Sequence, residues 1–595
     1  MATLRDFSPL ESITLPSLGT IDSSGLTLIV GPNSSGKSQF LRDIALRLSG
    51  EPRQLVVATD VKLRYLAYTD LLPVLKERGF LTEFEDDAGT KHLRPLTTYA
   101  GSGQQAQQIP VAQLQTWYNT SQSTQNTFKR RDEYLGYLGR FLVTALFLDT
   151  RLTALNQAGM IDFISQSPQH DLQALYMNDQ AREELFEEIR ASFGKAVWPD
   201  VSRGTGVCLR VSDEGYIPTS EERLSPRRMA EYRTIETEGD GLKSYVATCV
   251  ALLLGRRPVC IVDEPELCLH PPQAYNLGRF IGRFGSSLDG ETFVATHSSH
   301  ILRGVIETAP RLRIIRMTRL ERQFQAHTVS AEVLQEALQK PTVRAESVLD
   351  GIFAQAIAVV EADGDRTVYQ AVWETLERDV RMDLHFTTVG GTGGIADTCR
   401  LYRTLKIPIA VIADLDVVAD PDRIHKMLEG LGAENAEILA GEARRISEMI
   451  RSLPPTISES ETRAAVLDVV PDTLRWENGD DSKVRTALRS ISNKVDRMRR
   501  LKVPGEEPLP PALANALREL LAHLKAGGLF VVPVGELEGW LHGRGVTASK
   551  HNKWAWANDA ASVIRAAGRQ EDDVWAFVTE MGLFLDSKLT DTVRS

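Results

Sequence analysis

The chain has 595 residues, of which 42% are hydrophobic and 25% charged, so it has the composition of a globular protein with room for roughly three to four domains. No apolar run reaches the ~18–20 residues that cross a bilayer, and the N-terminus lacks a secretory signal, so we expect a cytoplasmic protein without membrane contact. The net charge of −11 argues against a protein that coats DNA by charge alone, and the five cysteines form no CxxC pair, which disfavours a disulfide framework and a zinc site.

The N-terminal half alternates short apolar runs with helical stretches, which predicts α/β architecture. Strands are predicted at Leu26–Val30, Val207–Val211, Val259–Val262 and Thr292–Ala295, and a helix at Ser38–Leu48. Residues from about 65 to 200 are expected to form a mostly helical insertion. A helical stretch near 331–355 is expected to link the two halves of the chain.

A second α/β pattern begins at residue 356. Strands are predicted at Ala356–Val360, His385–Val389, Ile407–Ala413 and Leu529–Val534, and helices at Arg366–Arg378 and about 395–405. Residues from about 420 to 525 are expected to form a helical insertion that contains a proline-rich break at Pro504–Pro511. The predicted boundaries are therefore 1–335 and 356–595 for two domains, with 336–355 as a linker.

A phosphate-binding loop follows the first predicted strand of the N-terminal half. Residues 31–38, GPNSSGKS, match G-x-x-x-x-G-K-[ST] between a strand and a helix, which is the context that the motif requires. The residues expected to surround phosphate with backbone N–H groups are Gly31, Asn33, Ser35 and Gly36. Lys37 would reach the β- and γ-phosphates and Ser38 would hold Mg²⁺, so the sequence predicts an ATP site.

Two carboxylates stand at the end of an apolar strand, where Val262 is followed by Asp263 and Glu264. Asp263 would complete the Mg²⁺ shell, and Glu264 would polarise the attacking water. A purely structural role for two acids at a buried strand end is disfavoured because burying them without a cation is costly. His297 follows the next strand and is a candidate sensor of the γ-phosphate, although a lone histidine is more often structural.

The segment DEPELCLHPPQ, followed by ATHSSHIL, resembles the Walker B, D-loop and switch-histidine region of ABC-type ATPases, particularly the RecF-like and overcoming-lysogenization-defect (OLD) branch. In that family a signature loop of one subunit caps the ATP bound to the other, so the resemblance implies at least a homodimer. The matching stretch is Glu238–Ser244, in which Gly239 and Gly241 would contact the nucleotide. It departs from the usual Ser-Gly-Gly pattern, and a simple glycine turn is the alternative.

Acidic residues also follow strands of the second half. Glu361 follows the first strand, a glycine-rich turn at 390–394 follows the second, and Asp414 and Asp416 form an Asp-x-Asp after the third. Adjacent strand ends lie ~4.8 Å apart, so these carboxylates could converge at one rim of a sheet. Hard oxygen ligands favour Mg²⁺ or Mn²⁺, which activate water for attack on a phosphodiester. An Asp-x-Asp by itself is often only a solvated loop.

This ordered set resembles the Toprim domain, and its place after an ABC ATPase resembles OLD-family nucleases, including the Gabija nuclease and retron-associated effectors. The resemblance implies that Asp365 joins Glu361 in an E-x-x-x-[DE] element and that Glu536 and Glu538 are further metal ligands. A helix N-terminus would equally favour acids at those two positions. Ala362 departs from the glycine that the family has after the glutamate.

The family also implies a lysine that stabilises transition-state charge. Lys550 and Lys553 both fit this position, and Lys553 is taken as the catalytic candidate. The basic segment Lys483–Lys502 is either a solvated helix face or a phosphate-contacting helix.

Together the motifs predict a nucleotide-regulated, divalent-metal-dependent endonuclease of double-stranded DNA that uses ATP and Mg²⁺ or Mn²⁺. The resemblance implies antiphage defence, a homodimer or higher oligomer, and a companion such as a helicase-like protein or a reverse transcriptase with its DNA. The alternative is a RecF-like DNA-binding ATPase or regulator with a non-cleaving Toprim scaffold. A Toprim primase or topoisomerase is disfavoured because Tyr369 and Tyr402 have no recognisable nucleophile context.

Overall fold

The computed structural model divides the chain into two compact units, Met1–Glu336 and Ala337–Ser595. It describes the chain except for residues 1–8, 23–24, 50–53, 65–66, 78–80, 96–108, 122–141, 165, 167, 169, 255–256, 287–289, 332–333, 337–339, 341–345, 377–381, 390–393, 455–456, 470–479, 502–508, 550–551, 572 and 595. None of the helices in the described ranges combines the length and hydropathy that a bilayer crossing needs.

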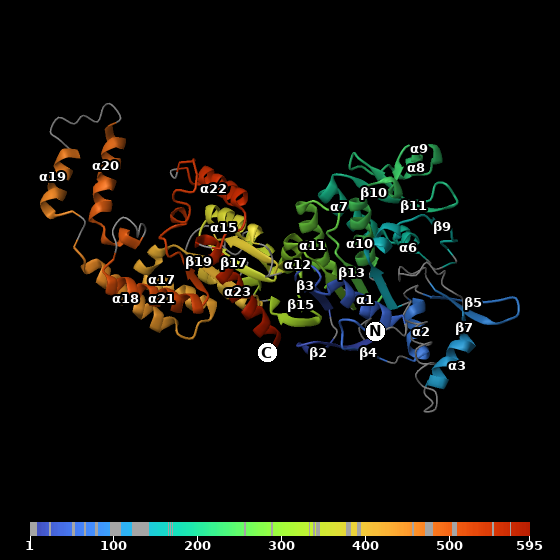
Figure 1. Ribbon diagram of the computed structural model, residues 1–595. Helices are drawn as coiled ribbons and strands as arrows, with labels where there is room; N and C mark the ends of the chain where they lie inside the picture. The colour runs from blue at the N-terminus through green and yellow to red at the C-terminus, as the bar shows by residue number, and fades with distance from the viewer. Residues whose placement is uncertain are drawn as a thin grey trace. The chain divides into compact units, whose positions relative to one another are not determined.

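A six-stranded sheet forms the centre of the first unit, in the order β16-β15-β3-β14-β13-β8 (Figure 1). Its strands are β3 (Gly25–Val30), β8 (Val143–Leu146), β13 (Val259–Asp263), β14 (Glu291–Ala295), β15 (Leu312–Leu320) and β16 (Gln323–Val329). All neighbours are parallel except β15 and β16. Strands β13 and β14 are buried along their whole length, as expected for a parallel sheet covered on both faces.

Helices of the first unit lie against this sheet or extend from it. They are α1 (Lys37–Leu48), α2 (Tyr68–Glu77), α3 (Val111–Ser121), α5 (Leu148–Thr153), α6 (Asp171–Met177), α7 (Asp179–Phe193), α8 (Ser220–Arg223), α9 (Pro226–Met229), α10 (Asp240–Leu254), α11 (Pro271–Gly285) and α12 (Ser299–Thr308). Helix α1 packs against β13 and β14, and α11 packs along α12. The phosphate-binding loop connects the end of β3 at Val30 to the start of α1 at Lys37.

The range 65–200, predicted to be a mostly helical insertion, contains helices and also several short strands. That range contains β5 (Leu81–Glu85), β6 (Lys91–Pro95) and β7 (Ile109–Pro110), which form an antiparallel sheet, as well as β8, β9 (Ala158–Gly159) and β10 (Ala196–Asp200). Strand β8 even belongs to the central sheet, beside β13. Strands of two to five residues carry too little periodicity to be recognised, and they are fixed by pairing with distant segments.

Two further antiparallel sheets complete the first unit. One contains β1 (Leu10–Leu15), β2 (Gly19–Asp22) and β4 (Asp60–Leu63), and the other contains β9, β10, β11 (Gly206–Ser212) and β12 (Arg233–Thr234), where the short η2 (Ile235–Thr237) follows. Residues of the first sheet pack with α1 and β3 in one apolar core. The phosphate-binding loop is thus held between two sheets that share a core.

A four-stranded parallel sheet, β18-β17-β19-β20, forms the centre of the second unit. Its strands are β17 (Ala356–Val360), β18 (Leu384–Thr388), β19 (Ile409–Ala413) and β20 (Leu529–Val531), so all four predicted strands are confirmed. The helices that cover it include α15 (Asp363–Thr375), α16 (Ile395–Thr404), α22 (Lys553–Ala567) and α23 (Asp573–Arg594), and α15 and α22 lie side by side (Figure 1).

Part of the predicted linker is folded onto this second sheet. Helix α14 (Glu346–Asp350) and η3 (Gly351–Phe353) contact β18. The Tyr402 hydroxyl donates to the carbonyl of Val348 at 2.6 Å, and His385 Nε2 lies 2.8 Å from the Ser347 carbonyl. The second unit therefore begins before residue 356, and the linker prediction is wrong for these residues.

The segment between β19 and β20 is helical, as predicted. It contains η5 (Leu415–Ala419), α17 (Pro421–Leu431), α18 (Ala436–Ser452), α19 (Glu459–Val469), α20 (Asp480–Val495), η7 (Arg497–Leu501) and α21 (Pro511–Ala526), and η8 (Leu537–Gly539) follows β20. Helix α18 packs against α17 and α21, whereas α19 packs against α20 (Figure 1). Most of the proline-rich break, like Lys502, lies outside the described residues.

Candidate functional sites

The phosphate-binding loop has the backbone of a ready anion cradle. Gly31 has φ 142° and Gly36 has φ 96°, both in the region that favours glycine, and Ser34 also has a positive φ of 61°. A Cβ on Gly31 would overlap the carbonyl of Met317 in β15. The loop is therefore pressed against the sheet, and its turn leads directly into the first N–H groups of α1.

The polar residues of this loop point inward to different degrees. Lys37 is 5% exposed, and its ammonium donates to the carbonyls of Gly31 at 2.8 Å and Pro32 at 2.9 Å. Burial lowers the pKa of Lys37, although nearby carboxylates oppose this shift. The Ser35 hydroxyl is buried and has no hydrogen-bond partner among the described residues, while Asn33 is exposed. The loop thus offers a cation and polar groups to a phosphate.

Ser38 and Asp263 meet as the sequence predicts, because the Ser38 hydroxyl donates to Asp263 Oδ1 at 2.9 Å. Asp263 ends β13 and is 9% exposed, and burial raises its pKa. Ser38 lies in the first turn of α1, so its hydrogen bond to Asp263 joins the helix that follows the loop to the end of β13. An alcohol and a carboxylate in contact are the oxygen donors that a Mg²⁺ ion takes beside bound phosphate.

Glu264 and His297 form a second contact beside this pair. Glu264 has a positive φ of 47°, and its carboxylate Oε1 lies 3.4 Å from Nδ1 of His297. This interaction lowers the pKa of Glu264 and raises the pKa of His297. The buried carboxylate of Glu266, which the sequence analysis did not single out, accepts from the backbone N–H of His297 at 2.8 Å and from the Thr296 hydroxyl at 2.8 Å. The histidine is therefore fixed between two acids.

Arg151 is a site residue that sequence reasoning missed. It is completely buried in α5, and its guanidinium donates to the backbone carbonyls of Asp263 and Glu264, the latter at 3.0 Å, and to that of Leu146 at 3.2 Å. Burial lowers its pKa. No motif marks this arginine, because its role depends on β8 lying beside β13. The guanidinium fork holds the backbone that presents both acids.

The stretch matched to a signature loop lies at the start of α10. Glu238 accepts from Lys195 at 2.9 Å and from Arg233 at 2.8 Å, which fixes the loop entry. A Cβ on Gly241 would overlap the carbonyl of Cys268, in the D-loop region of the same chain, whereas Gly239 has open space around it. Gly241 is thus required by packing, and Gly239 is the position that leaves room for an approaching group.

An acidic cluster lies at the carboxyl ends of β17 and β19. Burial raises the pKa of Asp414 to about 8, and repulsion from Asp365, Glu361, Asp416 and Glu536 adds to this shift. Burial likewise raises the pKa of Asp365 to about 6, with repulsion from Glu361 and Glu538. These mutual effects require that the acids lie near one another. The structure therefore places these carboxylates, which follow β17, β19 and β20, within electrostatic range of one another.

Connections within the backbone support the same cluster. The N–H of Leu415, next to Asp414, donates to the carbonyl of Gly535 at 2.8 Å, which joins the Asp-x-Asp turn to the loop that carries Glu536 and Glu538. Asp365 lies in the first turn of α15 and accepts from the N–H of Ala362 at 3.0 Å. Ala362 is therefore an N-cap position whose extended backbone needs no glycine.

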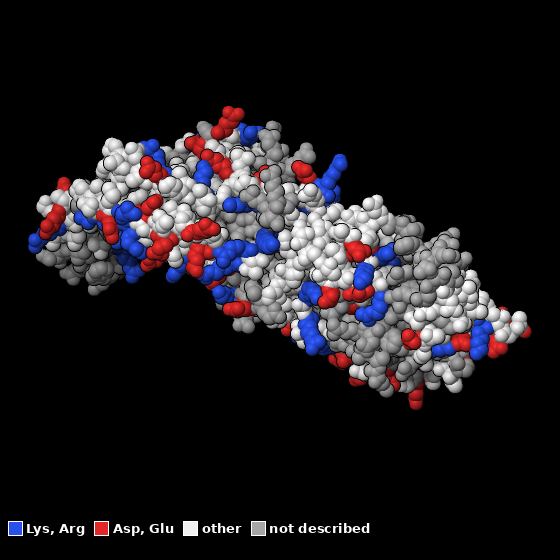
Figure 2. Space-filling view, turned by 90° about the horizontal axis from the view of Figure 1, so that it is seen from below, with Lys and Arg blue, Asp and Glu red and all other residues white. Residues whose placement is uncertain are grey.

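Of the two candidate lysines, Lys553 opens α22, and its charge partly opposes the burial that raises the pKa of Asp365, so it lies within electrostatic range of the acidic cluster. Lys550 lies outside the described residues, as does the turn at Gly390–Gly393. The exposed cations Lys483, Arg485 and Arg489 lie on α20. On the face seen in Figure 2, basic and acidic side chains are interspersed over the described surface.

Arg423 is the second site residue that sequence reasoning missed. It comes from α17, and its Nη2 lies 2.6 Å from Oε1 of Glu361. In the described ranges no three His, Cys, Asp or Glu side chains are close enough around one point to hold a metal ion. The donor set is all oxygen and fits Mg²⁺ or Mn²⁺, but Glu361 would have to leave Arg423 to join a metal.

Both tyrosines considered as topoisomerase nucleophiles are buried. Tyr369 is 1% exposed with its hydroxyl 3.3 Å from Trp540 Nε1, and Tyr402 is fully buried with its hydroxyl on the Val348 carbonyl. Burial raises the pKa of both phenols. Neither oxygen is therefore available to attack DNA.

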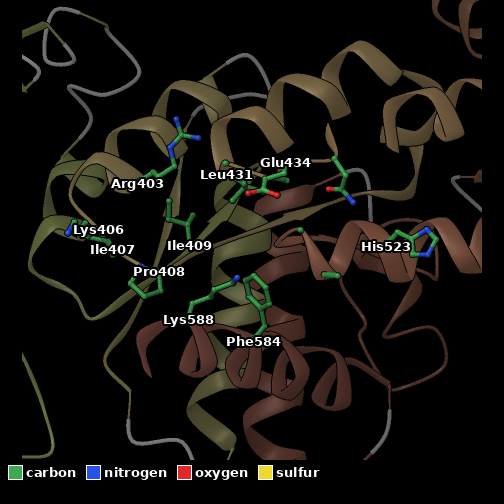
Figure 3. A pocket seen from close by; sticks show the side chains of 15 residues that line it. Arg403, Lys406, Ile407, Pro408, Ile409, Leu431, Glu434, His523, Phe584 and Lys588 are labelled. Atoms are coloured by element: carbon green, nitrogen blue, oxygen red, sulfur yellow. The ribbon is translucent and has the colours of Figure 1, made fainter. Parts of the chain in front are cut away.

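A cavity of about 890 Å³ lies at the other end of the second sheet, where β19 begins (Figure 3). Its lining includes Arg403, Lys406, Glu434, Phe584 and Lys588. Arg403 is committed to the carbonyl of Glu429 at 2.8 Å. None of the predicted site residues lines this cavity, so it is separate from the acidic cluster.

Comparisons with known proteins agree with the division of the chain into two units. Residues 132–303 match the family model "AAA domain, putative AbiEii toxin, Type IV TA system", and residues 352–416 match the model "Overcoming lysogenization defect protein-like, TOPRIM domain". A search of curated proteins gave no match.

Solved structures similar to the chain are SMC heads. One is an SmcHead bound to the C-winged helix domain of ScpA, with 13% identity, coverage of 56% of this chain and 100% of that one, and a TM-score of 0.32. Another is the SMC head domain from Thermotoga maritima, with 15% identity, coverage of 54% and 99%, and a TM-score of 0.28. The chain therefore carries a segment that matches the AAA-domain model in its first unit and a segment that matches the OLD-like TOPRIM model in its second unit.

Proposed function

We propose that this protein is a nucleotide-regulated, divalent-metal-dependent endonuclease of double-stranded DNA. The observation that carries the proposal is the placement of Glu361, Asp365 and Asp414 at one edge of the sheet, where burial, together with repulsion between these acids, raises the pKa of Asp414 to about 8. Carboxylates that repel one another in a half-buried site gain most from a divalent cation. When bound, Mg²⁺ or Mn²⁺ would activate water and neutralise charge on the phosphodiester.

In this proposal each residue of the acidic cluster has a distinct task. Glu361, Asp365, Asp414 and Asp416 would hold a first ion, and Glu536 and Glu538 would hold a second. Lys553, exposed at the start of α22, contacts the phosphate and stabilises its developing charge. The basic helix α20 offers Lys483, Arg485 and Arg489 for contacts with DNA phosphates other than the one that is cleaved.

The ATPase domain would regulate this cleavage through dimerisation. Lys37, Ser38 and Asp263 would hold Mg-ATP, Glu264 would orient water, and His297 would contact the γ-phosphate. The open space at Gly239 suits approach to ATP bound by a second copy, so we propose a homodimer or larger homo-oligomer. We further propose a cytoplasmic role in antiphage defence, with a companion such as a helicase-like protein or a reverse transcriptase with its DNA.

The test is cleavage of supercoiled plasmid by the purified chain in Mg²⁺ or Mn²⁺, with and without ATP. Nicking or linearisation should be lost in Asp414→Ala and kept in Glu437→Ala, whose exposed carboxylate lies on α18. The comparison with and without ATP gives the sign of regulation. Equal cleavage by wild type and Asp414→Ala would contradict the proposed site.

A second candidate function is a RecF-like DNA-binding ATPase or regulator whose Toprim domain does not cleave. The ion pair between Glu361 and Arg423 favours it, because it neutralises a proposed metal ligand without a metal. This function predicts ATP-dependent dimerisation and DNA binding with an intact plasmid under every condition. It also predicts that Mn²⁺ stabilises wild type and Asp414→Ala equally.

A further inference from the structure

Trp554 is an unusually exposed tryptophan near the acidic cluster. Its side chain is 77% exposed, whereas Trp556, two residues later on the same helix, is 4% exposed and packs in the core of the second unit. Among the exposed large apolar side chains in the described part of this unit, Trp554 is the only aromatic one. Tryptophan is buried on average because its large ring gains much from leaving water. The exposed ring is therefore available to a ligand.

The ring stands on a rigid support beside the acids. Helix α22 packs along α15, and a Cβ on Gly364 would lie 3.6 Å from the Cβ of Ala557, so the first turns of the two helices are adjacent. The Asp559 carboxylate of α22 accepts from the N–H groups of Thr547 at 2.7 Å and Ala548 at 2.9 Å, which anchors these two residues to the helix. Gly364 immediately precedes Asp365. The start of α22, which carries Trp554, therefore lies beside the first turn of α15, which carries Asp365.

The neighbours of Trp554 are suited to a nucleotide. Lys553 precedes it in the chain, is exposed, and acts electrostatically on Asp365. Asn552 caps the helix by accepting from the N–H of Ala555 at 3.2 Å. Lys553 and Trp554 therefore lie in a capped first turn of α22. A cation for phosphate beside an aromatic face for a base is the combination by which proteins bind single-stranded nucleic acid. In a duplex the base faces are covered by neighbouring bases, so only an unpaired base can stack there.

We propose that Trp554 is a stacking platform for an unpaired base next to the acidic cluster, so that the preferred substrate is DNA with single-stranded character at the cut. This inference rests on the proposed nuclease function and narrows its substrate class. A frayed end, a flap, or a duplex opened by a partner would each present such a base. Trp554 is a binding residue in this scheme and takes no part in proton or metal chemistry.

The test measures binding in the full chain that carries Asp414→Ala, so that DNA is not cut. Fluorescently labelled single strand, splayed duplex and fully paired duplex of the same sequence are compared by anisotropy. Trp554→Ala should weaken binding of the single strand and the splayed duplex by about 5- to 100-fold, with a change of less than about 2-fold for the paired duplex. Trp554→Phe should keep most of the affinity, and Leu583→Ala, an exposed apolar control on α23, should change nothing.

A second readout reports the stacking directly. The fluorescence of 2-aminopurine at the unpaired position should fall when the chain with Trp554 binds, and should recover in Trp554→Ala. The proposal is overturned if Trp554→Ala leaves single-strand binding intact, weakens the paired duplex equally, or instead changes the oligomeric state seen by light scattering.

These outcomes are distinguishable from failure of the nuclease proposal. Plasmid cleavage that depends on Asp414, together with unchanged single-strand binding in Trp554→Ala, would contradict the stacking proposal and support the nuclease proposal. Loss of stacking in Trp554→Ala, without any Asp414-dependent cleavage, would support the stacking proposal and contradict the nuclease proposal.

Discussion

Arg423 Nη2 lies 2.6 Å from Oε1 of Glu361, so the acidic rim of the Toprim sheet contains a cation supplied by the helical insertion. Both side chains are 20% exposed, which limits screening of the pair by water. Glu361 follows β17, the central strand that the family model covers, whereas Arg423 comes from α17, beyond the matched residues. The insertion therefore reaches into the proposed site, where Arg423 would compete with a metal for Glu361.

We expect Arg423→Gln to increase the affinity of the acidic cluster for Mn²⁺. Removing the guanidinium frees Glu361 and leaves more negative charge for a divalent ion to neutralise. The concentration of Mn²⁺ that gives half-maximal thermal stabilisation should fall by roughly 2- to 10-fold, the scale of a partly screened ion pair. Differential scanning fluorimetry over a Mn²⁺ titration measures this.

Arg444→Gln is the matched control for that titration. Arg444 pairs with Asp422 at 3.0 Å on the same helical insertion, but its side chain is 54% exposed and that of Asp422 is 80% exposed. Its removal should leave the Mn²⁺ midpoint unchanged. A weaker Mn²⁺ response in Arg423→Gln would mean that the arginine supports the metal site.

The crowding at Asp414 predicts a pH dependence of stability in metal-free protein. The folded pKa of about 8 is above the ordinary carboxyl value of ~3.9, so the folded chain keeps a proton that the unfolded chain has lost. Stability should therefore decrease as pH rises from about 4 to 8. In EDTA, the melting temperature of Asp414→Asn should fall less than that of wild type between about pH 4 and 8, because the asparagine amide does not ionise.

Metal should reverse this dependence, because a cation binds the ionised carboxylate and displaces the proton. The increase in melting temperature that Mn²⁺ gives should be larger at pH 8 than at pH 6 in wild type, and small at both in Asp414→Asn. A wild-type response that is independent of pH would contradict the raised pKa of Asp414.

The sequence predicts those parts of the sites that local motifs encode. The loop from Gly31 to Ser38 needs a strand, a glycine turn and a helix start, all within fourteen residues of one another, and the structure has them in that order. Asp414 and Glu361 could likewise be placed at one rim, because parallel strand ends meet there. Their roles in catalysis stay predictions.

The residues that sequence reasoning missed act across long separations. Arg151 reaches Asp263 only because β8 pairs with β13, and a four-residue strand has no detectable periodicity. Arg423 reaches Glu361 from a helix 62 positions away. Both are arginines paired with oxygen in covered sites, a relationship that spacing within one chain segment does not reveal.

We expect Glu264→Gln to stop ATP hydrolysis while keeping ATP bound. The His297 imidazole near Glu264 lowers the pKa of that carboxyl, so it is ionised and able to orient water at neutral pH. Phosphate release should fall by about 100-fold or more, the scale for loss of a catalytic base. Light scattering with ATP should show a larger dimer fraction than in wild type, whereas Glu184→Gln, an exposed control, should behave as wild type. Unchanged hydrolysis would remove Glu264 from its proposed role.

Arg151→Met tests whether the buried guanidinium positions the catalytic backbone. Methionine fills much of the space but cannot donate to the carbonyls of Asp263 and Glu264, so the strained Glu264, with φ 47°, loses its support. Loss of the guanidinium donors should cost about 1–3 kcal/mol in the free energy of unfolding. The Glu264 carbonyl keeps one donor, the N–H of Leu267 at 3.2 Å.

Hydrolysis in Arg151→Met should then fall more than ATP binding, because Lys37 and Ser38 still hold the phosphates. A urea titration and a filter-binding measurement separate the two effects. Arg283→Met, which removes an arginine 58% exposed to solvent, is the control for loss of charge. Equal losses of ATP binding and hydrolysis would mean that Arg151 supports the fold of the whole site. A folded variant with normal hydrolysis would show that the Glu264 backbone keeps its position without Arg151.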